Sequence, residues 1–359
     1  MEFSHFCLPT YIADRDGDPA GYMQRLVDFL ASSEDLGFDG VWANEHHFHP
    51  FGGIIPSVPI FLAALAQRTK RLRLGSSVMV LPLHHPLHVA EELAMVDLMS
   101  GGRVELGVGR GFVLYDYEVF GVPIADGQER TTEALDVILK AWSGERFSHH
   151  GKHFSFTNVQ VWPAPRQRPH PPIAFACTSS LDHAVWAADR GYKLLSVAYI
   201  KPLDKLAALT RHYRQAWVAS GKPKETCRVQ THFQVVVAET RKEARQVTAD
   251  SLQRYTALHA DAMTLSSNAE LQAREAAIED LNIDRLIDEG RLIAGTPDEC
   301  VATILRARDE AGMTDLDCNF YFGGMDFDFA QRSIGLFAAE VMPANRAAER
   351  EPVASAANA

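Results

Sequence analysis

Histidine and acidic residues gather directly after a short apolar run near the start of the chain. Residues Asn44–His49 read Asn-Glu-His-His-Phe-His and follow the run Gly40–Ala43. An imidazole titrates near neutral pH and can donate or accept a proton, and an adjacent carboxylate can orient it. We therefore interpret Glu45, His46 and His47 as candidate catalytic residues. The alternative is that these histidines only satisfy backbone groups at a strand end.

A second group of histidines reads His84-His85-Pro-Leu-His88 and opens a predicted helix. Together the two groups hold six of the 15 histidines, which raises the hypothesis of a metal site because histidine is the commonest metal ligand. The chain has no His-Glu-x-x-His pattern and no obvious carboxylate ligand pattern elsewhere. We expect no metal, and packing or pocket-lining roles for these residues.

Glycine and hydroxyl residues that could bind an anion follow two further apolar runs. Gly107–Gly111 reads Gly-Val-Gly-Arg-Gly, in which Arg110 can bond a phosphate through two nitrogens. Thr178, Ser179 and Ser180 precede a predicted helix, where free backbone N–H groups attract anions. Taken together they predict a phosphate site, although Ser180 alone would be read as a helix N-cap. The glycines lack the last position of Gly-x-Gly-x-x-Gly, which disfavours a dinucleotide-binding fold.

Small residues also end the run that contains Ser76, Ser77 and Val78. They leave room for a flat ring against the backbone, although barrel packing would explain them equally well.

The elements that must position these residues alternate between short apolar runs and segments of helical periodicity. Eight such runs with helices between them predict a closed (β/α)8 TIM barrel in the α/β class, and not an open sheet. The carboxyl ends of barrel strands meet at one face, so the polar segments above should lie together. The predicted strands are 3–8, 40–43, 72–80, 104–108, 173–176, 194–198, 228–237 and 316–322.

The length of 359 residues and the 47% hydrophobic content favour one elaborated domain over two. We expect this domain to span residues 1–344. The aromatic and proline-rich segment 146–172 predicts a hairpin-like insertion, and the segment 257–291 predicts a mobile lid. We expect the tail 345–359 to be disordered.

Charge and cysteine content exclude several classes of partner. The formal net charge of −11 disfavours nucleic acid and anionic membranes. Five widely spaced cysteines without a Cys-x-x-Cys pair argue against a disulfide framework and favour a reducing cytoplasm. No apolar run approaches the ~18 residues needed to span a bilayer, and the N-terminus does not resemble a signal peptide.

The chain resembles the bacterial luciferase-like family of flavin-dependent monooxygenases over about residues 3–343. The motifs that carry the resemblance are Asn-Glu-His-His-Phe at 44–48, Leu-Gly-Ser-Ser-Val-Met-Val-Leu-Pro at 74–82, Met-Ser-Gly-Gly-Arg at 99–103, Gly-Val-Gly-Arg-Gly at 107–111 and Gly-Thr-Pro-Asp-Glu-Cys at 295–300. The resemblance implies a (β/α)8 barrel that binds reduced FMN at its carboxyl face, usually as a dimer.

The resemblance also implies roles for individual residues. Ser77-Val78 would be a non-prolyl cis peptide bond beneath the flavin ring, beside Ser76 and Gly109. The phosphate of FMN would be held by Arg110, Ser179 and Ser180, with Thr178 or His183 assisting. His46 matches the catalytic histidine of the family.

The implied reaction is that of a two-component monooxygenase. A separate reductase supplies reduced FMN, O₂ adds to give a C4a-peroxyflavin, and one oxygen atom passes to a small apolar organic substrate. Gly109 departs from the luciferases, which carry a reactive cysteine there, so light emission is not expected. Aromatic residues near the predicted strand ends suggest the apolar substrate: Phe6, Trp42, Phe48, Phe51, Phe112, Tyr115, Tyr199 and Phe322.

Three alternatives remain open at this point. Related barrels bind the deazaflavin F420 in the same place and transfer hydride, which O₂ consumption would distinguish. The chain could be a non-catalytic flavin-binding subunit of a heterodimer, although such a subunit has no chemical need for both His46 and Arg110. A metal-dependent hydrolase would require a bound ion.

Overall fold

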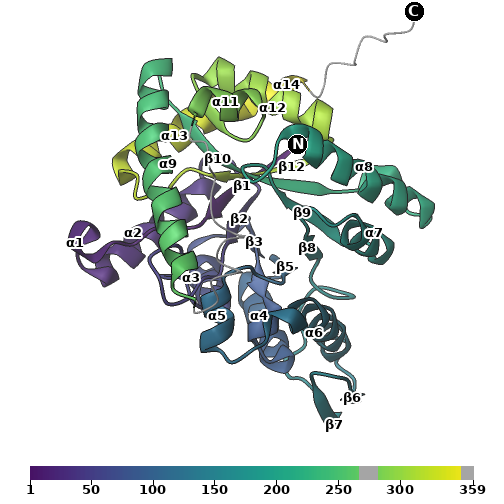
Figure 1. Cartoon of the computed structure of the whole chain (residues 1–359). Coiled ribbons are helices and arrows are strands. Elements are labelled where there is room, and N and C mark those ends of the chain that lie inside the picture. Colours follow the sequence, from purple (N-terminus) through teal and green to yellow (C-terminus); the bar gives the residue numbers. More distant parts are fainter. Residues whose placement is uncertain (267–281, 349–359) are drawn as a thin grey trace, which may run out of the picture.

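Eight parallel strands close into a barrel in the computed structural model, which describes residues 1–266 and 282–348 (Figure 1). The order is β12, β1, β2, β3, β5, β8, β9 and β10, and β10 pairs with both β9 and β12, which closes the ring. This confirms the predicted (β/α)8 barrel. The barrel strands are β1 (Glu2–Cys7), β2 (Gly40–Ala43), β3 (Arg73–Ser76), β5 (Val104–Gly109), β8 (Ile173–Ala176), β9 (Lys193–Val197), β10 (Val229–Val237) and β12 (Asp315–Asn319).

The strands are apolar runs because helices cover their outer faces and side chains fill the barrel. Every residue of β2, β5, β10 and β12 is buried. Trp42 fills part of the interior, and a Cβ atom at Gly75 on the neighbouring strand would lie 2.3 Å from its ring. The glycine therefore leaves the space that the indole occupies.

An outer layer of helices surrounds the barrel in Figure 1. Thr296 begins α12 with a capping box in which the Thr296 backbone N–H donates to Glu299 at 2.9 Å, and Gly312 ends it in a left-handed conformation. The main helices are α2 (Pro19–Ala31), α3 (Val58–Arg68), α4 (Pro86–Ser100), α6 (Gly127–Trp142), α7 (Leu181–Arg190), α8 (Leu203–Ala219), α9 (Arg241–Thr264), α12 (Pro297–Ala311) and α13 (Phe327–Leu336).

The first predicted insertion does contain a hairpin. Strands β6 (Phe147–His150) and β7 (Ser155–Val159) pair antiparallel, apart from the barrel sheet, as the expectation for 146–172 required. Figure 1 shows this hairpin projecting beyond α6.

The predicted lid, 257–291, divides between several elements. Its first part is the end of α9, its last described part contains α11 (Ile283–Asp288), and residues 267–281 lie outside the described residues. Strand β11 (Ile293–Gly295) then pairs with β10. The lid role therefore stays a prediction.

The domain boundary expected at Asn345 is too early. Helix α14 (Met342–Ala348) continues through it, Asn345 is only 1% exposed, and its Nδ2 donates to the Val341 carbonyl at 2.9 Å. Burial and this hydrogen bond hold the residue in the domain. Residues 349–359 lie outside the described part of the chain.

A polar network occupies the end of the barrel at which the strands begin. Glu105 accepts from Arg73 Nε at 2.8 Å and from Lys193 Nζ at 2.9 Å. Gln230 accepts from Lys193 at 3.1 Å and donates to the Asp317 carboxyl at 2.7 Å. Burial raises the pKa of Asp317 to about 8. A network at this end serves stability, because barrel chemistry sits at the opposite face.

All five cysteine thiols are buried and unpaired with one another, as expected without a disulfide framework. In the described ranges, no helix combines the length and the apolar character that crossing a membrane requires.

Candidate active site

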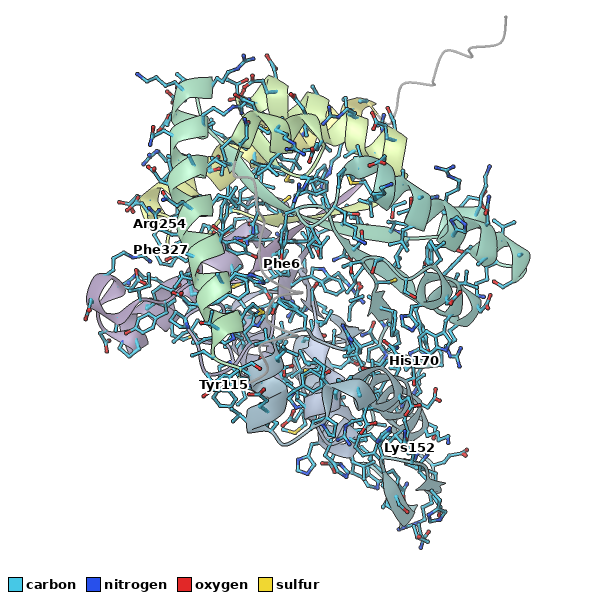
Figure 2. All side chains as sticks on the ribbon, viewed as in Figure 1. Phe6, Tyr115, Lys152, His170, Arg254 and Phe327 are labelled. Atoms are coloured by element: carbon cyan, nitrogen blue, oxygen red, sulfur yellow. The ribbon has the colours of Figure 1, made fainter. Side chains whose placement is uncertain are left out.

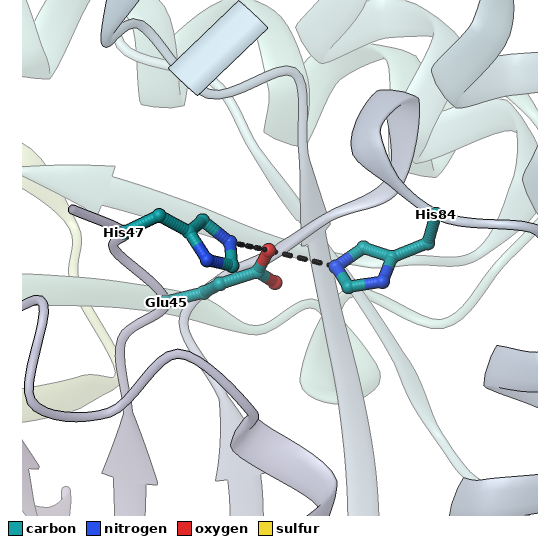
Figure 3. Close-up of side chains that lie close together, drawn as sticks. All are labelled: Glu45, His47 and His84. Atoms are coloured by element: carbon teal, nitrogen blue, oxygen red, sulfur yellow. Dashed lines mark hydrogen bonds and ion pairs between the residues drawn. The ribbon is translucent and has the colours of Figure 1, made fainter. Parts of the chain in front are cut away.

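Glu45 lies at the centre of a hydrogen-bonded cluster beyond the end of β2 (Figure 3). Its Oε1 accepts from His47 Nε2 at 2.9 Å and from His84 Nε2 at 2.7 Å, while Oε2 accepts from the Val80 backbone N–H at 3.0 Å. Burial raises the pKa of Glu45, but the two histidines outweigh it and lower the pKa to about 2. The side chain is therefore an ionised carboxylate at neutral pH.

The Glu45 cluster joins the two histidine groups that the sequence suggested separately. His84 follows β4 (Met79–Val80), and Glu45 raises the pKa of His84 against the lowering effect of burial. An acid was expected to orient an imidazole here, and it orients His47 and His84. Within the described residues, no hydrogen bond joins Glu45 to His46.

His46 is enclosed by aromatic rings. It is 4% exposed, and its ring centroid lies 5.1 Å from Phe51 and 5.9 Å from Phe112. Burial lowers the pKa of His46 well below its usual value, so the imidazole is neutral and able to accept a proton at neutral pH. Gly52 allows this packing, because its φ is +77° and a Cβ atom there would lie 2.7 Å from the His46 ring.

A small cavity of about 40 Å³ opens beside these residues. Its wall brings together Glu45, His46 and Val78 from the predicted site, and adds Asp116, which the sequence analysis did not identify. A larger hollow of about 380 Å³ lies between β10 and α13 and contains none of the predicted residues. The smaller cavity is the better candidate for chemistry, because it alone of these two holds predicted site residues at the carboxyl ends of barrel strands.

The Ser77-Val78 peptide bond is cis, which confirms the expectation. Asn44 Nδ2 donates to the Ser77 carbonyl at 3.0 Å, and the Ser77 N–H donates to the Ala43 carbonyl at 2.8 Å. Ser77 and Val78 are half-buried, so a ligand can reach them. Asn44 is thus a positioning residue for this peptide.

Gly109 lies against the Val78 side chain. A Cβ atom at Gly109 would be 2.8 Å from Val78 Cγ2 and 3.3 Å from Ala176 Cβ. Glycine therefore leaves the room in which the Val78 side chain packs against β5, beside the cis peptide.

Ser76 was expected to contact the cofactor, but its side chain is buried beneath the site. The residue is 0% exposed, and its Oγ donates to the Gly107 carbonyl at 2.8 Å and accepts from the Gly107 N–H at 3.0 Å. The hydroxyl joins β3 to β5 and is unavailable to a ligand in this conformation. We correct its assignment from cofactor contact to support beneath the site.

The residues predicted to bind phosphate lie on neighbouring strand ends. Val108 of β5 pairs with Phe175 of β8, which places the loop containing Arg110 beside the loop containing Thr178–Ser180. Arg110 and Ser179 are exposed. Ser180 accepts from the His183 backbone N–H at 3.3 Å and caps α7, so the N-cap interpretation also holds.

Helix α9 supplies an aromatic wall that the sequence analysis missed. Tyr255 and His259 lie 5.0 and 5.1 Å from Phe51, and His259 lies 5.7 Å from Phe112. Their spacing of four residues places both on one helical face, which was the available signal. In Figure 2 the lower end of α9 lies near Tyr115, while Phe6 lies in the middle of the barrel.

Three groups of described side chains have ligand atoms close enough for a metal ion. In the first group, His47 and His84 each already donate a hydrogen bond to Glu45. A second group lies at the surface, where Lys152 contacts Glu129, and the third contains His46, His49 and Asp116. Because the first two are explained by their own ion pairs, they do not indicate a metal.

The chain matches relatives of known activity along most of its length. It is 29% identical to 4-hydroxyprotoasukamycin monooxygenase of Streptomyces nodosus subsp. asukaensis, over 96% of this chain and 92% of that protein. It is 31% identical to limonene 1,2-monooxygenase of Rhodococcus erythropolis, over 87% and 78%. The crystal structure of the monooxygenase RslO1 from Streptomyces bottropensis superposes with a TM-score of 0.86 at 29% identity, covering 96% and 99%.

More distant structures share the fold alone. One is the oxygenating constituent of 3,6-diketocamphane monooxygenase from Pseudomonas putida in complex with FMN, at 21% identity and a TM-score of 0.79 over 96% of this chain and 98% of that one. Another is an F420-dependent secondary alcohol dehydrogenase, at 19% and 0.74 over 96% and 99%. The model of the luciferase-like monooxygenase family matches residues 1–315. Together with the barrel, the cis peptide and the buried histidine, this match establishes that the chain belongs to the luciferase-like monooxygenase family.

Proposed function

We propose that this chain is the oxygenase component of a two-component monooxygenase that uses reduced FMN and O₂ to oxygenate a small apolar organic substrate. The observation that carries the proposal is the neutral, buried His46 beside the accessible cis peptide Ser77-Val78, at the catalytic face of the barrel. The names of its relatives support a monooxygenase.

The residues present fit a flavin. Ser77 and Val78 are half-buried and offer an accessible backbone surface to a planar ring, and Gly109 leaves the room that the Val78 side chain needs. Arg110 and Ser179 are exposed on adjacent loops and would hold a terminal phosphate, with Thr178 and Ser180 beside them. Reduced FMN, when bound, would supply the electrons that activate O₂.

Proton transfer is assigned to His46. Its lowered pKa leaves a ring nitrogen free to accept a proton, and its aromatic enclosure keeps bulk water away. Glu45 binds His47, His84 and the Val80 N–H, and so fixes the loop that carries His46. We therefore assign Glu45 and His47 to positioning within the catalytic group.

An apolar substrate fits the side of the site formed by α9. Phe112 lines the cavity beside His46, and Phe51 packs against His46 with Tyr255 behind it. The substrate class is proposed from this lining.

The proposed assembly is a homodimer supplied by a separate flavin reductase in the cytoplasm. Helices α3 and α4 carry large exposed apolar side chains, namely Ile60, Met95, Leu98 and Met99. Such a surface is suited to self-association. Met95→Glu should convert a dimer into a monomer in sedimentation experiments, whereas exposed Val218→Glu on α8 should not. A dimer unaffected by Met95→Glu would place the interface elsewhere.

The decisive experiment is an anaerobic titration of the purified protein with reduced FMN and, in parallel, with reduced F420. We expect reduced FMN to bind, and its reoxidation by O₂ to be slower on the protein than in solution. A substrate screen then follows O₂ consumption and product mass. Tight binding of F420 without a response to reduced FMN would replace this proposal with hydride transfer.

A further inference from the structure

Asp116 and His49 are buried polar side chains beside His46 that the proposed reaction has not yet used. Asp116 is on α5 (Leu114–Val119) and is 4% exposed. Its Oδ1 and His49 Nε2 have no hydrogen-bond partner in the described structure and lie 3.8 Å apart. Buried polar atoms are nearly always paired, because an unpaired one has lost its hydrogen bonds to water without replacement. This pair therefore calls for a functional explanation.

The geometry connects this pair to His46. One atom each from His46, His49 and Asp116 lie within 4.8 Å of one another, and both His46 and Asp116 line the cavity. A movement of about 1 Å would bring the Asp116 oxygen within hydrogen-bond distance of His49. The titratable groups that face the pair are Glu45, His46 and His47 from the same loop as His49, and His259 from α9.

The two carboxyl groups near the cavity have opposite surroundings. Glu45 has three hydrogen-bond donors and is ionised. Burial raises the pKa of Asp116 to about 7, against the lowering effect of His47, and burial lowers the pKa of His49 to about 4. Below about pH 7 the proton of this pair therefore resides on Asp116, next to an imidazole that stays neutral down to about pH 4. Such divergence between neighbouring acids is typical of acid–base sites.

We propose that Asp116 acts through His46. Asp116 stores the proton that His46 delivers, and His49 is the relay between them. The inference rests on the proposed function. In that reaction one atom of O₂ enters the substrate and the other leaves as water, so a proton must reach the departing oxygen. The transfer is concerted: His46 gives its N–H proton to that oxygen and takes a proton from His49, which takes the Asp116 O–H proton, so that neither imidazole becomes cationic. Conversion of reduced FMN to FMN would release two protons together with the electrons that reduce O₂; one would complete the water, and the other would restore Asp116.

The kinetic test is the pH profile of Asp116→Asn. In Asp116→Asn we expect product formation near pH 6 to be 10- to 100-fold lower than in the wild type. Wild-type activity should decrease as the pH rises above about 7, and the activity of the variant should not show this decrease. Affinity for reduced FMN should be unchanged, and Asp116→Glu should restore part of the rate. The double variant Asp116→Asn/His49→Gln should lose no more product formation than the more damaging of the two single variants, because both residues serve one relay. If Asp116→Asn lowered product formation equally at every pH and kept the decrease above about pH 7, Asp116 would have only a structural role.

A second test needs neither cofactor nor turnover. Infrared spectra of the cofactor-free protein should show the carbonyl stretch of a protonated carboxyl group that disappears around pH 7 in the wild type and is absent in Asp116→Asn. Asp317→Asn is the matched control, because Asp317 is another buried carboxyl with a raised pKa at the opposite end of the barrel. That variant should lose a different band and keep the wild-type pH profile of product formation.

The combined outcomes separate the two proposals. Oxygenation without the Asp116 band would overturn the proton store and leave the proposed function intact. The Asp116 band without oxygenation would disprove the role of the pair in oxygenation, together with the proposed function.

Discussion

Glu45 and His46 are adjacent in the chain but have opposite electrostatic environments. Glu45 is kept charged by two imidazoles, whereas burial keeps His46 neutral. The types of these residues indicated acid–base chemistry from the sequence. Their partners were not predictable, because His84 is 39 residues from Glu45 and Asp116 has no distinguishing local pattern. Burial and long-range contacts set the pKa values of Glu45 and His46, and the spacing of residues in the sequence reveals neither burial nor such contacts.

His46→Ala should separate cofactor binding from chemistry. Because His46 is assigned to proton transfer, we expect normal affinity for reduced FMN and a loss of product formation of about 10²-fold or more. Anaerobic titration and product analysis measure the two effects. His88→Ala, at an exposed position on α4, is the control. Unchanged product formation in His46→Ala would remove this residue from the mechanism.

His84→Ala should destabilise the loop that carries Glu45. The substitution removes the donor 2.7 Å from a buried carboxylate, for which we expect a loss of about 1–3 kcal/mol in the free energy of unfolding. Urea denaturation at pH 7 measures it, again with His88→Ala as the control. An equal effect of the two substitutions would show that the Glu45 cluster contributes little to stability.

At the scale of elements, the strands and their order were predictable because a barrel strand is a short apolar run that ends in functional residues. The strand boundaries were less predictable. Leu72–Val80 was expected as one strand, but β3 ends at Ser76 and β4 begins at Met79, with the cis peptide between them. Periodicity cannot detect such an interruption. The inward face of α9 was missed because helix 241–264 has mostly polar residues, and its aromatic contacts depend on how it crosses the barrel mouth.

Arg110→Ala tests whether the loops after β5 and β8 form one anion site. A charge-assisted bond to phosphate contributes about 1.5–3 kcal/mol, so affinity for reduced FMN should fall roughly 10- to 100-fold. The rate at saturating cofactor should change little, because Arg110 is remote from the assigned proton transfer. Arg190→Ala, whose guanidinium lies over Trp186 on α7, is the matched control. Unaltered affinity in Arg110→Ala would show that the phosphate lies elsewhere.

At the scale of the whole molecule, the two ends of the barrel divide stability from chemistry, and Asp317 allows the stability end to be tested by pH. Its pKa is about 8 in the folded protein, against about 3.9 when unfolded. Because the folded state holds the proton more tightly, this group stabilises the fold fully below about pH 4, and its contribution is lost as the pH rises through about 8.

Asp317→Asn should therefore flatten the pH dependence of stability. Between pH 5 and 8 we expect the wild-type free energy of unfolding to fall by on the order of 1–3 kcal/mol more than that of the variant, since asparagine cannot titrate. Urea denaturation at the two pH values measures the difference. Asp204→Asn, at an exposed position on α8, should keep the wild-type slope. Equal slopes for Asp317→Asn and the wild type would mean that Lys193 and Gln230 hold Asp317 ionised, and that the network at this end is a fully charged one.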